Sequence, residues 1–153
     1  MSTRSIIAEP YGDGFRGRYC HSDGYPTWNG EQLHAIVQRD GVERARQVVI
    51  HENTYWSSIS AGHAGPSYNV ENDTRFVDVA SYGVAGPGQD VAPDEFITEH
   101  ADWGTEYTYI LADSGLWCFD AYDPNHIPVI VKYTAIDVCW GSVEAQLSKQ
   151  SAA

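Results

Sequence analysis

The sequence has few positive charges, and most of them lie in its first third. Nine Lys and Arg stand against 21 Asp and Glu in 153 residues, which gives a formal net charge of −12. No Lys or Arg occurs from residue 76 to residue 131, a span that holds ten acidic residues. Binding to a nucleic-acid backbone needs a cationic surface that displaces counterions. The sequence therefore argues against direct nucleic-acid binding, and leaves a basic partner, a metal ion or simple solubility as interpretations of the acidic span.

Cysteines and long apolar runs are also scarce. The three cysteines, Cys20, Cys118 and Cys139, form no C-x-x-C pair, and an odd number cannot close a complete disulfide framework. The apolar run at residues 6–8 is too short for the core of a signal peptide. No stretch approaches the roughly 20 apolar residues that span a bilayer. We therefore expect reduced thiols, a cytoplasmic location and no membrane partner.

Aromatic residues, by contrast, are plentiful, with five Trp and ten Tyr against four Phe. Trp and Tyr join an apolar body to a polar group, so they favour half-buried sheet faces and binding surfaces. The length predicts a single domain over residues 1–153, large enough for a core of its own. Trp56 and Trp103 are expected to anchor that core.

The strand pattern is clearest near the two ends of the chain. Residues 4–9 and 15–20 are predicted strands, joined by the Asp-Gly turn within residues 11–14. A second predicted hairpin pairs residues 106–111 with 116–119. These pairs flank a helical segment, which predicts an α+β fold: an antiparallel sheet with two short helices packed on one face.

The remaining regions are less regular. Residues 128–140 contain at least one further predicted strand. The middle segment, about 51–102, is expected to be irregular apart from one strand at 75–82, because glycine and proline interrupt its pattern.

Two helices are predicted between the strand pairs. Asn29 is placed to cap the first, whose apolar face contains Leu33, Ile36 and Val37. Asp40 is placed to cap the second. The inward residues of the second helix are predicted to be Val42, Ala45, Val48 and Val49.

The loop after the second strand gathers residues that can do chemistry. If the strand continues, His21 and Asp23 project to the same side, where they would hold a metal or act as acid and base. His100 and Asp102 repeat the same spacing, so the two pairs together would make a divalent metal site. The alternative is a structural turn in which Asp23 caps local amides. No cofactor is predicted other than this divalent metal.

A ligand pocket is a second hypothesis for the same region. Arginines on the first hairpin lie near aromatic residues, and this combination suits a nucleotide: guanidinium for phosphate and ring for base. The alternative is an ordinary sheet face with solvated arginines. The candidate ligand-binding residues are Arg4, Arg16, Arg18, Tyr19, His21, Asp23, Tyr25 and Trp28.

Several stretches also carry a resemblance to a known family. Thr3-Arg4-Ser5-Ile6, followed by Tyr19-Cys20-His21 and Asp23-Gly24-Tyr25-Pro26, resembles the opening of small uncharacterised proteins encoded by bacteriophages and some bacteria. Those proteins usually have Trp where this chain has Ser22. The resemblance implies a phage-type accessory protein in the cytoplasm of a bacterial host, and it implies no catalytic residue.

These observations favour a non-enzymatic accessory binding protein that engages or sequesters a bacterial host partner or a small nucleotide. The partner would be a host protein with a basic surface, which meets the acidic span, or a nucleotide held by the hairpin arginines. Two alternatives remain open: a virion or assembly component, and a small metal-dependent hydrolase that uses the His and Asp residues above.

Overall fold

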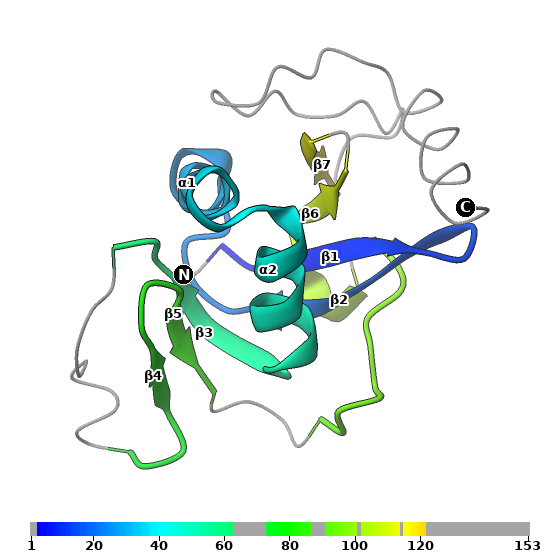
Figure 1. Cartoon of the computed structure of the whole chain (residues 1–153). Coiled ribbons are helices and arrows are strands. Elements are labelled where there is room, and N and C mark those ends of the chain that lie inside the picture. Colours follow the sequence, from blue (N-terminus) through cyan, green and yellow to red (C-terminus); the bar gives the residue numbers. More distant parts are fainter. Residues whose placement is uncertain (1–2, 63–72, 87–90, 101, 114, 122–153) are drawn as a thin grey trace.

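The computed structural model describes residues 3–62, 73–86, 91–100, 102–113 and 115–121. Within these residues, seven strands form one sheet, shown in Figure 1. Their order across the sheet is β4-β5-β3-β2-β1-β6-β7. The strands are β1 (Ser5–Tyr11), β2 (Gly14–Cys20), β3 (Tyr55–Ile59), β4 (Val77–Val79), β5 (Gly83–Ala85), β6 (Tyr107–Ala112) and β7 (Gly115–Asp120).

The sheet is mixed, so the prediction of a purely antiparallel sheet is wrong in this respect. The two predicted hairpins are present as the antiparallel pairs β1–β2 and β6–β7. The pairs β1–β6 and β2–β3 are parallel. The chain between β2 and β3 crosses over as helix, which lets both strands run in the same direction. The α+β class is confirmed.

Helical segments lie in front of the sheet in Figure 1 and cover one of its faces. They are η1 (Pro26–Gly30), α1 (Glu31–Asp40), α2 (Val42–Arg46) and η2 (Gln47–His51); a short η3 (Asp102–Gly104) precedes β6. The inward faces predicted for the helices are confirmed, since Leu33, Ile36 and Ala45 are fully buried. In the described part of the chain, no helix has the length and apolar character needed to cross a membrane.

The sheet buries apolar residues on both faces. Beneath the helices lie Ile7, Trp56 and Leu111, and the Trp56 indole donates to the main-chain oxygen of Val49 at 2.9 Å. Trp56 is therefore the core anchor that the sequence predicts. The opposite face buries a second cluster, which is covered by the chain that leads into β6. That cluster consists of Ile6, Ala8, Phe15, Tyr19, Ile97, Ile110, Ala112, Trp117 and Phe119, with Tyr55 and Trp103 packed against it.

Neither predicted helix cap is observed. Asn29 is fully buried inside the helical segment, and its amide contacts Ser5 Oγ at 3.2 Å and Cys20 Sγ at 3.4 Å. It ties the helices to β1 and β2 instead of capping a free end. The carboxylate of Asp40 accepts hydrogen bonds from Arg39 and Tyr82, and the second helix begins without a side-chain cap.

The middle segment is more regular than predicted. It contains β3, which lies in the interior of the sheet, and the predicted strand at 75–82 is replaced by the short strands β4 and β5. The pairing of β3 with β5 shifts register between Trp56 and Ser58, so buried Trp56 and Ile59 are three residues apart. This bulge breaks the alternation by which a strand is recognised. The strand predicted within 128–140 lies outside the described residues.

Candidate functional site

A cavity of about 350 Å³ opens on the face of the sheet that the helices leave uncovered. Five described side chains line it; they come from distant parts of the chain and include three large aromatic rings. They belong to Arg4, Tyr19, His21, Tyr55 and Trp103. We call this cavity the Arg4 pocket.

Parallel pairing of β2 and β3 builds the centre of the Arg4 pocket. Tyr19 and Tyr55 are direct partners in the two strands, so their side chains leave the same face, and their ring centroids are 5.0 Å apart. The amide of His21 donates to the main-chain oxygen of Trp56 at 2.9 Å, which prolongs the pairing beyond Cys20. Because side chains alternate along a strand, His21 joins Tyr19 on the same face.

Trp103 forms a wall of the pocket in an unusual conformation. Its φ is +61° and its ψ is 23°, in the left-handed region, and Gly104 follows with φ +71°. Such a conformation costs a bulky residue about 1–3 kcal/mol and persists only where tertiary structure requires it. The indole lies 5.4 Å from the Tyr19 ring, centroid to centroid. The strained turn therefore places an aromatic ring over the pocket.

A chain of hydrogen bonds links the polar groups of the pocket. The hydroxyl of Tyr19 lies 2.9 Å from Nδ1 of His21, and the hydroxyls of Tyr19 and Tyr55 hydrogen-bond to each other. Burial raises the pKa of Tyr19 and raises that of Tyr55 to about 12, so both phenols keep their protons at neutral pH. When Tyr55 donates to Tyr19 and Tyr19 donates to Nδ1, a neutral His21 carries its own proton on Nε2.

The pocket consequently offers donors and aromatic faces. Arg4 is exposed, and none of the ion pairs between described residues involves it. No carboxylate is found among the described lining residues. An N–H of His21 and the guanidinium of Arg4 would both favour an acceptor-rich or anionic group. The arrangement thus suits a planar ligand that carries negative charge.

The structure brings three of the predicted ligand-binding residues together, namely Arg4, Tyr19 and His21. Arg18 lies elsewhere and is 1% exposed, and main-chain oxygens occupy its donors. The acceptors are Ile50 at 2.8 Å, Glu95 at 2.9 Å and Pro93 at 2.7 Å. Arg16 pairs with Glu9 at 2.8 Å. The structure does not bring Arg16 and Arg18 together with Arg4. Side chains alternate along β2, so these two arginines lie on the helical face, opposite Tyr19.

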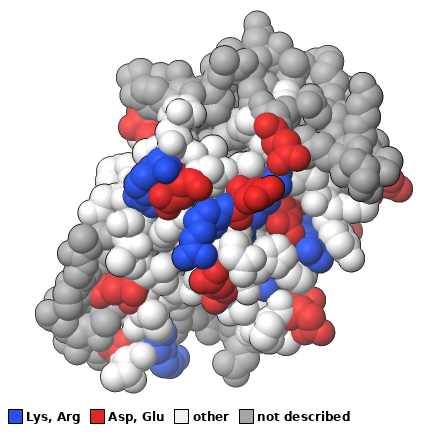
Figure 2. Space-filling model, viewed as in Figure 1, with Lys and Arg blue, Asp and Glu red and all other residues white. Residues whose placement is uncertain are grey.

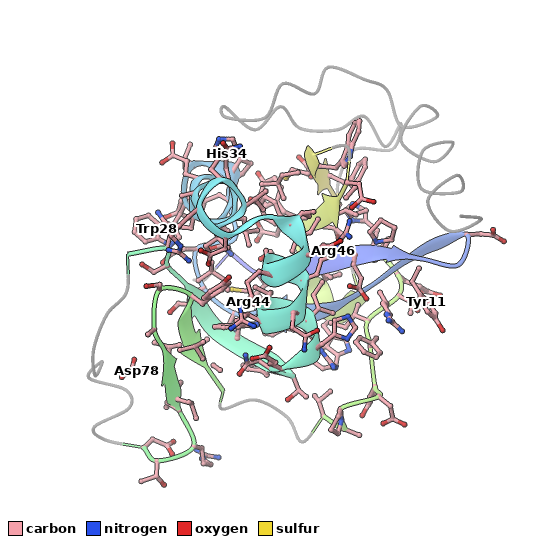
Figure 3. All side chains as sticks on the ribbon, viewed as in Figure 1. Tyr11, Trp28, His34, Arg44, Arg46 and Asp78 are labelled. Carbon is pink, nitrogen blue, oxygen red and sulfur yellow. The ribbon has the colours of Figure 1, made fainter. Side chains whose placement is uncertain are left out.

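The other predicted residues form the turn into η1 and do not line the Arg4 pocket. The hydroxyl of Tyr25 donates to Asp23 at 3.2 Å, and the indole of Trp28 donates to the oxygen of Ile59 at 3.1 Å. Figure 3 shows Trp28 beside α1, and it is not among the described residues that line the Arg4 pocket. Asp23 itself has a φ of +56°. The Asp23 carboxylate thus bonds to Tyr25 within the turn, and the amide of Asn29 donates to the main-chain oxygen of Asp23 at 3.2 Å.

Gly24 is needed in that turn because its main chain packs closely against residues 3–5. A Cβ at Gly24 would lie 2.8 Å from the Cβ of Ser5 and 2.8 Å from the oxygen of Thr3. The positive φ of the turn belongs to Asp23, and Gly24 lets the turn pack against the start of β1.

The proposed metal ligands are not gathered in the residues that the structure describes. No three His, Cys, Asp or Glu side chains there are placed to hold one ion. Nδ1 of His21 is engaged by Tyr19, and Nδ1 of His100 lies 2.6 Å from Oγ1 of Thr108. The side chain of Asp102 lies outside the described set, so its meeting with His21 stays a prediction.

Sequence reasoning did not name Tyr55 or Trp103 for the pocket. Both lie in or beside the segment expected to be irregular. Trp103 packs against the core, as expected, and also lines the pocket. The Trp-Gly pair at 103–104 was the available signal, because glycine often accompanies a tight turn that presents its neighbour.

Comparisons with protein-family models, with curated protein sequences and with solved structures found no match to this chain. The function must therefore be inferred from the chemistry of the Arg4 pocket and of the rest of the described surface.

Proposed function

We propose that the protein is a phage-type accessory binding protein that holds a small nucleotide in the Arg4 pocket. The observation that carries the proposal is the convergence of one guanidinium, one imidazole and three aromatic rings on a single cavity. Arginine pairs with phosphate oxygens in a fixed fork geometry, and aromatic rings stack on bases. A volume of about 350 Å³ lies at the lower end of the range for small-ligand pockets.

The proposed ligand is small because the positive charge at the pocket is small. Arg4 is the single described cation that lines it, in a protein with a formal charge of −12. Such a protein repels a long polyanion, whose binding depends on many cationic contacts. The negative charge that this pocket can neutralise is that of one or two phosphates beside Arg4 and His21.

The pocket is proposed to bind its ligand without transforming it. Both tyrosine hydroxyls remain protonated at neutral pH, because burial raises their pKa values, so they are poor nucleophiles. His21 is committed at Nδ1 to Tyr19. Its Nε2 then acts as a hydrogen-bond donor, which holds a phosphate but does not abstract a proton from water.

The cellular setting rests on the resemblance described above. Arg4, Tyr19 and His21 belong to the stretches by which the chain resembles small phage and bacterial proteins, and they are neighbours in the Arg4 pocket. We place the protein in the cytoplasm of a bacterial host, where it would sequester a nucleotide.

A host protein with a basic surface is a weaker candidate partner. Figure 2 shows that described cations and acids are interspersed on the helical face. Arg39 pairs with Asp40 and Arg44 pairs with Glu52 on that face. Neutralised pairs of this kind do not make the helical face a strongly acidic surface that would attract a basic partner.

Isothermal titration calorimetry with AMP, GMP, adenosine and inorganic phosphate tests the proposal. At least one nucleotide should bind saturably, and adenosine or phosphate alone should bind at least about tenfold more weakly, since each fills half of the pocket. Arg4→Ala should weaken nucleotide binding by about tenfold or more, because it removes the only described cation that lines the pocket. Arg44→Ala, on the helical face, is the matched control. If neither AMP nor GMP binds saturably, the proposal is contradicted.

A further inference from the structure

A second cleft, of about 310 Å³, lies at the other end of β1 from Arg4. Its described lining is almost entirely charged or ionisable and comes from β1, β2, the turn after β6 and the α2–η2 helical segment. The lining residues are Glu9, Pro10, Arg16, Arg46, His51 and Asp113. We call it the Glu9 cleft. None of these residues lines the Arg4 pocket.

The centre of the Glu9 cleft is a buried carboxylate bonded to an imidazole. Glu9 is 7% exposed, and its two oxygens lie 3.0 and 2.9 Å from Nε2 of His51. A buried carboxylate in this position fixes the ring orientation and the tautomer of its histidine, and stabilises the imidazolium when it forms. The His51 side chain is 31% exposed. Its second nitrogen, Nδ1, has no hydrogen-bond partner among the described residues and is available to a bound molecule.

Two guanidiniums are held rigidly at the same cleft. Arg16 donates to Glu9 and lies between the rings of Tyr11 and Phe96, at 4.0 and 4.8 Å from their centroids. Figure 3 places Tyr11 beside the outer part of β1. The stacking fixes the guanidinium plane, because a cation is attracted to the face of an aromatic ring.

Arg46 is the second guanidinium. It donates from Nε to the oxygen of Leu111 at 2.6 Å and pairs with Asp113 at 3.0 Å. Its side chain is 19% exposed, whereas that of Arg44 on the same helix is 57% exposed. Figure 3 labels both, and Arg46 is the one directed toward β1. The pairing leaves another nitrogen of Arg46 for an anion.

The charges of the Glu9 cleft indicate the kind of anion. Its two guanidiniums are balanced by its two carboxylates when His51 is neutral. A balanced site accommodates a single negative charge better than a dianion or a polyanion. No Ser, Thr or Cys is among the described lining residues, so the nucleophile would be water. A phosphodiester carries one negative charge, two non-bridging oxygens for the arginines, and a phosphorus atom that water attacks.

We propose that the Glu9 cleft hydrolyses small phosphodiesters, with His51 as general base. Nδ1 of His51 takes a proton from water, and the water oxygen forms a bond to phosphorus. The bond from phosphorus to the leaving oxygen breaks, and that oxygen receives the proton from His51. The products are a phosphomonoester and an alcohol, and the imidazole returns to its neutral form.

The other residues of the cleft support this step. Arg16 and Arg46 stabilise the charge on the non-bridging oxygens, while Glu9 is a positioning residue that acts through His51. No metal ion is required. The proposal rests on the Glu9 cleft alone and does not depend on nucleotide binding in the Arg4 pocket.

The test is hydrolysis of bis(p-nitrophenyl) phosphate and of a cyclic mononucleotide by the full chain, in buffer with EDTA. We expect turnover that EDTA does not reduce. His51→Gln should lower kcat by about 100-fold or more, since general base catalysis typically contributes at least that factor. The glutamine amide can still donate to Glu9, so this variant is expected to fold; its thermal melting is measured alongside. His34→Ala, on α1, is the matched control and should keep full activity.

Two further variants separate chemistry from architecture. Arg46→Ala should lower kcat by about 100-fold and Arg44→Ala should not, although both sit on α2. Glu9→Gln removes the carboxylate that holds Nε2 of His51 and should lower kcat while leaving KM nearly unchanged, a split that a merely structural role of Glu9 would not produce. No turnover above the buffer blank, turnover that survives His51→Gln, or turnover abolished by EDTA would each overturn the proposal. None of these results bears on binding to Arg4.

Discussion

The hydroxyl of Tyr19 lies 2.9 Å from Nδ1 of His21, two residues further along the chain. The contact exists because the strand pairing continues past the end of β2, through the bond from the His21 amide to Trp56. The same pairing sets Tyr55 beside Tyr19. The orientation of the imidazole in the Arg4 pocket therefore depends on the register of two parallel strands.

Tyr19→Phe is expected to weaken nucleotide binding while leaving the fold intact. The substitution keeps the ring but removes the group that holds His21, and it leaves the Tyr55 hydroxyl without its partner. A single hydrogen bond is worth about 0.5–1.5 kcal/mol, so we expect affinity to fall about three- to tenfold. Calorimetric titration with AMP measures it. Tyr25→Phe removes a hydroxyl outside the pocket and serves as control; equal losses in both variants would contradict the role assigned to Tyr19.

Arg18→Met is expected to destabilise the fold strongly. The side chain is 1% exposed and donates to three main-chain oxygens, from Ile50, Pro93 and Glu95. Methionine fills much of the space but leaves these acceptors without donors, at about 1–3 kcal/mol for each one that stays buried. Urea unfolding should show a loss of at least about 3 kcal/mol.

The control for Arg18→Met is Arg44→Met, which removes an arginine whose side chain is 57% exposed. It should change the free energy of unfolding by less than about 1 kcal/mol, as is typical of exposed ion pairs. A small loss in Arg18→Met would mean that water or main-chain movement satisfies the three carbonyls.

Arg18 also shows what a sequence pattern leaves open. Local signals predicted both hairpins, the inward faces of the helices and the α+β class, because turn chemistry and apolar periodicity are properties of neighbouring residues. Arginine is nearly always exposed, so an Arg on a strand was interpreted as a surface cation. Its burial depends on carbonyls more than thirty residues away, which no local pattern reveals.

The candidate site was predictable for the same local reason, and only in part. Arg4, Tyr19 and His21 were named because they lie near one hairpin. Tyr55 joins them through a parallel pairing across a helical crossover, and parallel register has no signature in the sequence of one strand. Trp103 reaches the pocket through a left-handed backbone that few bulky residues adopt.

Gly17→Ala is expected to disrupt the β1–β2 hairpin. A Cβ at this position would lie 2.7 Å from the Cβ of Ala8, its partner on β1, and equally close to the Ala8 main chain. The neighbours are main chain and a short side chain in the middle of the sheet, so they have little freedom to move. We expect a loss of about 3 kcal/mol or more, or failure to fold. Circular dichroism and urea unfolding measure it.

The matched control for Gly17→Ala is Gly14→Ala in the same strand. A Cβ at Gly14 would have nothing within 4 Å, and its φ is not positive. This variant should be close to neutral or slightly stabilising, because alanine reduces the freedom of the unfolded chain. Similar destabilisation in both variants would mean that any side chain added to β2 disrupts it. The loss in Gly17→Ala could then not be assigned to the contact with Ala8.

The link between α1 and the turn before β5 should weaken in acid, because it depends on an ionised Asp40. Arg39 donates to both oxygens of this carboxylate, at 2.9 and 2.8 Å, and the Tyr82 hydroxyl donates at 2.7 Å. The bonds from Arg39, and then that from Tyr82, lower the pKa of Asp40 to about 2. A carboxyl with a lowered pKa in the folded state stabilises the fold above its unfolded pKa, near 3.8, and loses that contribution as the pH falls toward 2.

Asp40→Asn should therefore be less stable than the natural chain at pH 6, and the difference should shrink between about pH 4 and pH 2. Urea midpoints measured for both proteins across this range provide the test. The same substitution made in an Arg39→Met background should show a smaller pH-dependent part, because the larger cause of the lowered pKa has been removed. A difference between the two proteins that stays constant down to pH 2 would mean that the carboxylate charge contributes nothing, and that Asp40 acts only through the shape of its hydrogen bonds. Because the Asp40 side chain is solvent-accessible, added salt should reduce the pH-dependent part of the stability difference. A contribution from hydrogen-bond geometry alone would not respond to salt.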